Sequence, residues 1–95
     1  MRKNERGRLL ERVSDALEIP GEALAYMPGL TMTGNKRVHI EGHKGILQYD
    51  SDTIAVNGGV LIFKIYGDKL EIASMNAEEI LITGSISKFE FEDMP

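Results

Sequence analysis

From residue 30 to residue 91, apolar side chains alternate with polar ones in short segments separated by turn residues. Alternation with a period of two is typical of strands that bury one face of a sheet. The breaks are polar or glycine-rich and too short to hold a crossover helix between parallel strands. The pattern predicts a mainly β fold, an antiparallel meander of about seven to eight short strands curled into a roll or a small barrel. A β-solenoid is a weaker alternative, because the intervals between segments are irregular.

The most apolar segment is residues 60–66, which are apolar at nearly every position. A strand of this composition is expected at the centre of a sheet, covered on both faces. Two glycine-containing breaks, residues 67–69 and residues 83–85, are expected to be turns that separate the strands on either side.

Before residue 30, the apolar positions follow the helical period instead. Residues 8–18 place an apolar stripe on one face of a helix, at Leu9, Leu10, Val13, Ala16 and Leu17. The helix should end just before Pro20, and an isolated helix of about three turns is marginal in water. We expect it to dock on the protein's own sheet, with a partner or a membrane surface as alternatives. The chain therefore divides into residues 1–29, a basic arm, amphipathic helix and Pro-Gly connector, and residues 30–95, the β domain.

The length and the charge of the chain limit its possible functions. Ninety-five residues form one domain with one modest core, and the net charge is −4. Residues 1–12 hold five basic and two acidic side chains, so the remainder is strongly acidic and disfavours nucleic-acid binding. The chain has no cysteine, which excludes disulfides and thiolate chemistry. No apolar stretch approaches the roughly 18 residues of a membrane span, so we expect a cytoplasmic protein.

One spacing suggests metal chemistry. His39, Glu41 and His43 alternate, so a continuous strand would put all three on one face, where they could hold a zinc ion for a hydrolase. The favoured interpretation is a solvent-facing polar row, because Gly42 is expected to break the strand before His43. The sequence offers no catalytic triad and no phosphate-binding loop. We therefore expect no enzyme activity, no cofactor and no metal site, and the metal-dependent hydrolase is a remote alternative.

Exposed turn residues are the candidates for partner binding, because loops on a rigid sheet carry recognition. The candidates are His43, Lys44, Asn76, Glu78 and Glu79. Plain turn chemistry is the alternative explanation for all five.

Five segments of the chain carry a family resemblance. They are Leu17-Glu18-Ile19-Pro20, Met27-Pro28-Gly29-Leu30-Thr31-Met32-Thr33-Gly34-Asn35, Val38-His39-Ile40-Glu41-Gly42-His43-Lys44-Gly45-Ile46, Gly67-Asp68-Lys69-Leu70-Glu71-Ile72 and Met75-Asn76-Ala77-Glu78-Glu79-Ile80-Leu81-Ile82-Thr83-Gly84-Ser85-Ile86. These segments resemble the YabP/YqfC family of small sporulation proteins. The resemblance covers residues 17–89 and is closer to the YqfC branch.

The resemblance implies a non-enzymatic protein of endospore-forming bacteria, a structural or adaptor module needed for spore formation and for cortex or coat assembly. It implies a protein partner, an integral-membrane sporulation protein, and a location in the cytoplasm of the sporulating mother cell, peripheral to the forespore membrane. Residues 1–18 would contact the membrane surface, because their cationic side chains favour anionic lipid. The alternative is a self-assembling β scaffold, a homo-oligomer that forms a ring or filament, because residues 60–66 are apolar on both faces.

Overall fold

The computed structural model describes residues 27–95, so the predicted basic arm and amphipathic helix lie outside the described residues. Six strands form one antiparallel sheet, and residues 27–95 contain no helix. The strands are β1 (Gly29–Thr33), β2 (Arg37–Glu41), β3 (Ile46–Tyr49), β4 (Thr53–Asn57), β5 (Leu61–Met75) and β6 (Glu79–Asp93). The prediction of a mainly β, antiparallel fold is confirmed. Within the described range, nothing forms a helix long and apolar enough to cross a membrane.

The order of the strands in the sheet is β1-β2-β6-β5-β4-β3, so the predicted meander is right for β3 to β6 and wrong between β2 and β3. In a meander β2 would pair with β3, but here β2 pairs with β6 and places Val38 opposite Ile82 and Ile40 opposite Ile80. These four side chains are buried, so the pairing joins two apolar faces far apart in the chain. The sheet is open, with β1 and β3 as its two ends.

Strands β5 and β6 are each 15 residues long, so the number of strands is six and not seven to eight. The predicted turns at residues 67–69 and 83–85 are irregularities inside one long hairpin, where the register shifts between Tyr66 and Glu71. Glycine is required there because the two strands approach closely. A Cβ on Gly67 would lie 2.0 Å from the carbonyl oxygen of Ser85. Such bulges bend a strand without ending it, and they use the same residue types as turns.

The bend is held by the turns of the two smaller hairpins. At a bulge, backbone N–H groups lose their ladder partners and must find others. Four of them donate to turn carbonyls: Gly67 to Asp52 at 3.1 Å, Leu70 to Ser51 at 2.8 Å, Gly84 to Lys36 at 3.2 Å and Ile86 to Asn35 at 2.8 Å. The β3–β4 turn thus supports the bend of β5, and the β1–β2 turn supports the bend of β6.

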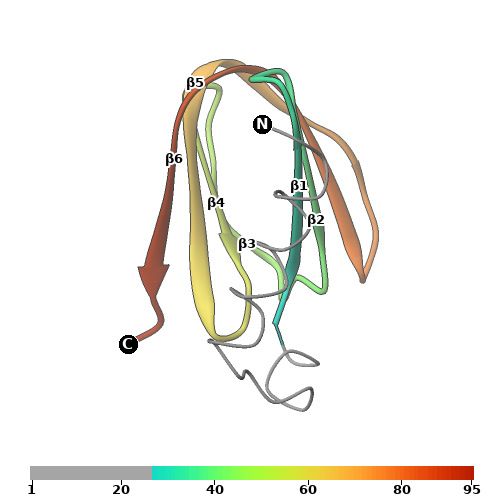
Figure 1. Ribbon diagram of the computed structural model, residues 1–95, viewed down its shortest axis with the longest axis vertical. Coiled ribbons are helices and arrows are strands. Elements are labelled where there is room, and N and C mark those ends of the chain that lie inside the picture. The colour runs from blue at the N-terminus through green and yellow to red at the C-terminus, as the bar shows by residue number, and fades with distance from the viewer. Residues whose placement is uncertain (1–26) are drawn as a thin grey trace, which may run out of the picture.

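Figure 1 shows β5 and β6 bending together over one end of the molecule, so that the sheet has two arms. The β3–β4 arm consists of β3, β4 and the halves of β5 and β6 formed by residues 61–66 and 86–93. The β1–β2 arm consists of β1, β2 and the halves formed by residues 70–75 and 79–83.

Side chains from both arms form one core. Its members are Val38, Ile40, Ile54, Val56, Phe63, Ile65, Leu70, Ile80, Ile82 and Ile86. In residues 60–66 only Phe63 and Ile65 are buried, whereas Val60 is 46% exposed. The expectation of a strand covered on both faces is therefore wrong for the described part of the chain, where only the inner face of β5 is covered.

Candidate functional site

The outer face of the β1–β2 arm carries a groove of about 520 Å³. Because strand side chains alternate, the residues that do not enter the core share this face. The register aligns Thr31, His39, Leu81 and Ser74 in one row across four strands. The groove is lined by Thr31, Thr33, Arg37, His39, Ser74, Met75, Asn76, Glu79 and Leu81. Hydroxyl, guanidinium and imidazole groups thus surround the apolar side chains of Leu81 and Met75, a mixture suited to recognition of another molecule.

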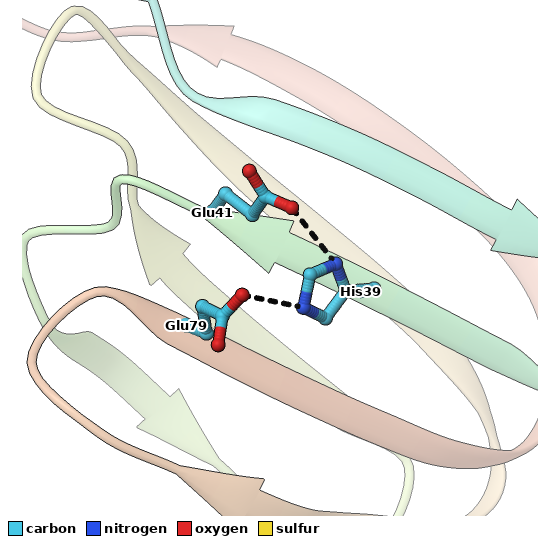
Figure 2. Close-up of side chains that lie close together, drawn as sticks. All are labelled: His39, Glu41 and Glu79. Atoms are coloured by element: carbon cyan, nitrogen blue, oxygen red, sulfur yellow. Dashed lines mark ion pairs between the residues drawn. The ribbon is translucent and has the colours of Figure 1, made fainter.

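His39 lies between two carboxylates in the groove wall (Figure 2). Its Nδ1 is 3.6 Å from Glu41 Oε1, and its Nε2 is 3.4 Å from Glu79 Oε1. The register places Glu41 directly opposite Glu79. Like charges in that position destabilise a sheet. A protonated His39 donates toward both carboxylates and offsets their repulsion.

The same three residues are the candidate metal ligands among the described residues, because one ligand atom from each lies within 4.8 Å of the others. The orientation of His39 does not suit one ion, however. Each of its ring nitrogens faces a different carboxylate, and the two nitrogens of an imidazole point away from each other. A single ion could bind only one of the two ring nitrogens of His39. The glutamate that faces the other nitrogen would therefore have to move to reach the ion. As it stands, the cluster is a polar contact between β2 and β6, in which His39 faces Glu79 across the pair of strands.

His43 does not join this cluster, so the predicted set of His39, Glu41 and His43 is not assembled. Gly42 has a φ of 75°, which turns the chain out of β2 before His43. The His43 side chain is only 5% exposed, so the expectation of an exposed turn residue is wrong for it. Glu79 takes the third place beside His39, and no sequence pattern indicated this because the pairing of β2 with β6 was not predicted.

Both ring nitrogens of His43 have hydrogen-bond partners. Nδ1 accepts from the backbone N–H of Gly45 at 3.0 Å, and Nε2 lies 2.7 Å from the carbonyl oxygen of Asn76. An amide N–H requires an acceptor and a carbonyl requires a donor, so the ring is neutral with its proton on Nε2. His43 therefore ties the β2–β3 connector to the β5–β6 turn.

Asn76 organises that turn. Its Oδ1 accepts from the backbone N–H groups of Glu78 at 2.8 Å and Glu79 at 2.7 Å, which is the pattern of an Asx turn. The Gly42 N–H donates to the Glu78 carbonyl at 2.7 Å, so the connector and the turn are adjacent. The structure thus brings the connector with His43 and Lys44 to the same end of the molecule as Asn76, Glu78 and Glu79. Lys44, Glu78 and Glu79 are exposed there, and their role in partner binding stays a prediction.

The outer face of the β3–β4 arm carries an ion-paired strip that the sequence analysis did not identify. Lys64 pairs with Glu92, Lys88 pairs with Glu90 at 3.1 Å, and the Tyr66 hydroxyl donates to Glu90 at 2.9 Å. Hydrogen bonds from Lys88 and then from Tyr66 lower the pKa of Glu90. The hydrogen bond to Glu92 raises the pKa of Lys64, and the hydrogen bond to Glu90 raises the pKa of Tyr66. The acidic end of β6 is therefore partly neutralised by basic side chains on the same face.

Arg37 differs from these basic residues. It lines the groove, is exposed, and forms no ion pair with any other residue in the range 27–95. Across the sheet it faces Thr33 on one side and Thr83 on the other. The groove therefore offers a cationic group to a ligand.

Comparison with known proteins identifies the family. The YabP family model matches residues 27–95, which is the whole of the described sheet. The uncharacterized protein YqfC of Bacillus subtilis (strain 168) is 34% identical over 87 residues, which are 90% of this chain and 88% of that protein. No solved structure matches the chain. The resemblance to YabP/YqfC proteins is thus confirmed, and the chain belongs to the YabP family.

Proposed function

We propose that this protein is a non-enzymatic sporulation protein that acts as an adaptor. The observation that carries the proposal is membership of the YabP family together with the similarity to YqfC over nearly the whole chain. Family membership supports an association with sporulation. The adaptor role is the further step, and it rests on the groove.

The groove of the β1–β2 arm is the surface that we assign to the partner. β1 is an end strand of the sheet, and its Thr31 and Thr33 line the groove. An extended segment of a partner can pair with the backbone of an end strand while its side chains enter the neighbouring groove. A carboxylate in that segment would find Arg37, which forms no ion pair within residues 27–95, and an apolar side chain would contact Leu81.

A non-enzymatic role agrees with how the two histidines of the described sheet are used. His43 is buried with both nitrogens bonded to backbone groups, so it has no free nitrogen to accept a proton from a substrate. His39 is held between two carboxylates, and its side chain is 34% exposed, whereas acid–base chemistry is strengthened where water is excluded. Both histidines therefore serve the sheet.

In the proposed role the partner is an integral-membrane sporulation protein, and the protein works in the mother cell, peripheral to the forespore membrane, in cortex or coat assembly. The basic residues 1–12 favour an anionic membrane surface beside such a partner. The acidic remainder of the chain disfavours nucleic acid as a ligand.

A pull-down tests the adaptor role. A tagged copy is expressed in the sporulating host and recovered from detergent-solubilised membranes, in wild-type form and as Leu81→Glu, which places a charge in the groove. The matched control is Leu47→Glu, because Leu47 is 54% exposed on β3, away from the groove. We expect a membrane-protein partner with the wild type and with the control, and its loss with Leu81→Glu. Equal recovery with both variants, or no partner with the wild type, would overturn the assignment of the groove.

A second candidate function is self-assembly. Charged residues and proline commonly prevent end strands from pairing between molecules. The two end strands of this sheet, β1 and β3, contain neither. Pairing of β1 of one copy with β3 of the next would build a ring or filament. Light scattering that finds only monomer at high protein concentration would exclude this scaffold.

A further inference from the structure

The core lies between the two arms, and its two sides differ in whether a hydrogen bond joins the arms there. On one side β3 of the β3–β4 arm lies beside the 70–75 half of β5, because the Tyr49 hydroxyl accepts a hydrogen bond from the Ile72 N–H at 3.1 Å. Within each arm, β3 and the 70–75 half of β5 are end strands, and the end strands on the other side are the 86–93 half of β6 and β1. These two strands bound the opposite side of the core, and they do not touch. No hydrogen bond between described residues joins these two strands. We call this the open side of the core.

The open side is lined by apolar side chains that face inward but are not covered. Leu30 and Met32 lie opposite the buried Ile40 and Val38, so they point to the inner face of β1. Phe89 and Phe91 pair with Ile65 and Phe63 and point to the inner face of β6. Leu30 and Phe89 are half-buried, Met32 is 40% exposed and Phe91 is 63% exposed. These four residues form the open-side patch.

The aromatic members of the patch are continuous with the core. The Phe89 and Phe91 ring centroids lie 5.1 Å apart, and each lies within 5.8 Å of the Phe63 centroid. Tilted and edge-on aromatic pairs at such distances are favourable. An aromatic cluster that begins in the core and ends 63% exposed at Phe91 is typical of a surface that another segment completes.

The chain enters the described sheet at this patch. A Cβ on Gly58 would lie 3.1 Å from Pro28 and 3.2 Å from the ring of Phe63, so Pro28 sits next to the aromatic cluster. Residues 19–27 are all that separate the predicted amphipathic helix from this point. A helix of 11 residues is about 16 Å long. The five residues of β1 span about 17 Å, so the two lengths match.

We propose that the apolar stripe of residues 8–18 covers the open-side patch and completes the core. The stripe of leucine, valine and alanine side chains would bury Met32 and Phe91 against Phe89 and Leu30. The net positive charge of residues 1–12 complements Asp93, which follows Phe91 on the inner face of β6 and forms no ion pair within residues 27–95. This inference concerns the free protein and does not depend on a role in sporulation.

A spin label tests the placement, because the chain has no cysteine and a single introduced one is unique. Ser14→Cys carries a nitroxide next to the stripe without altering it. We expect selective paramagnetic broadening of the amide signals of residues 30–32 and 89–91, and unchanged signals at Gln48 and Ile72 on the other side. Broadening of Gln48 and Ile72, or of no sheet residue, would overturn the proposal. A mixture of spin-labelled chains and isotope-enriched chains without the label provides the control. Broadening in that mixture would overturn the proposal, because the patch of one copy would then be covered by residues 8–18 of another.

A fluorescence measurement gives an independent test. The chain has no tryptophan, so Phe91→Trp places a sole reporter in the patch. We expect blue-shifted emission that moves to the wavelength of exposed tryptophan when Val13→Glu puts a charge in the stripe. Ser14→Glu, the matched control beside the stripe, should leave the emission unchanged. The proposal would be overturned if Phe91→Trp alone, with residues 8–18 unchanged, already emitted at the wavelength of exposed tryptophan. Identical spectra for the two glutamate variants would also overturn it.

Discussion

His43 and His39 lie four residues apart but serve the sheet in different ways. His43 is buried and bonds backbone groups on two segments, whereas His39 lies at the surface between Glu41 and Glu79. The difference follows from Gly42, whose positive φ turns the chain between them. The i, i+2, i+4 spacing that suggested a metal site holds only in a continuous strand.

Replacement of His43 should destabilise the protein strongly. His43→Ala leaves the Gly45 N–H and the Asn76 carbonyl without their partners and opens a cavity, so we expect a loss of about 2–3 kcal/mol in the free energy of unfolding. His39→Ala removes only surface contacts with Glu41 and Glu79 and should cost less than about 1 kcal/mol. Urea unfolding of both variants measures the difference. Equal losses would contradict the assigned role of His43.

Part of this cluster was predictable from the sequence and part was not. The alternation of residues 37–41 correctly placed His39 and Glu41 on one outer face. Glu79 joins them through a pairing between strands separated by more than 35 residues, and such a pairing depends on the register of the whole sheet. A local pattern carries no information about it.

The ion-paired strip on the outer face of the β5–β6 hairpin predicts a weak dependence of stability on pH. Because the pKa of Glu90 is lowered below its usual 4.5 in the folded protein, its contribution is present above about pH 4.5 and is lost as the pH falls through the folded pKa. Glu90→Gln should therefore flatten the acid limb of the curve of unfolding free energy against pH.

The matched control is Glu71→Gln, because Glu71 is exposed on the same hairpin and forms no ion pair within the described sheet. Denaturant midpoints measured at a series of acidic pH values provide the curve. An acid limb that keeps its slope in Glu90→Gln and loses it in Glu71→Gln would contradict the assignment.

The bend of the same hairpin depends on glycine. Gly67→Ala would place a methyl group against the Ser85 carbonyl, and backbone atoms cannot yield without breaking the bulge. We expect a loss of about 3 kcal/mol or more in unfolding free energy. Gly34→Ala is the control: its φ is 53° but nothing lies within 4 Å, so it should cost only about 1–2 kcal/mol. Thermal or urea unfolding compares the two, and a Gly67→Ala protein as stable as Gly34→Ala would contradict the role of the bend.

The glycines of the bend also show where prediction of the elements fails. The alternating pattern located the apolar segments, and each of them lies within a strand apart from Val60, which precedes β5. Gly67 and Gly84 lie between such segments, and a bulge and a turn favour the same residues. The sequence therefore could not distinguish four short strands from two long, bent ones. The close approach of Gly67 to Ser85 is a tertiary contact and leaves no local signal.

At the scale of the whole molecule, the bent hairpin places the two smaller hairpins on opposite arms and gives each arm an inner and an outer face. The inner faces form the core. The outer face of the β1–β2 arm carries the groove with its unpaired Arg37, whereas the outer face of the β3–β4 arm carries paired charges. Because of this asymmetry, we assign the partner to the groove.

The proposed role is that of an adaptor in spore formation that binds its partner through the groove. The most direct measurement is the count of heat-resistant spores after deletion of the protein from its host and complementation with wild type, Leu81→Glu or Leu47→Glu. We expect a loss of spores on deletion, recovery with wild type and Leu47→Glu, and failure with Leu81→Glu at equal protein level. Normal spore counts after deletion would contradict the role in sporulation, and full recovery with Leu81→Glu would contradict the role of the groove.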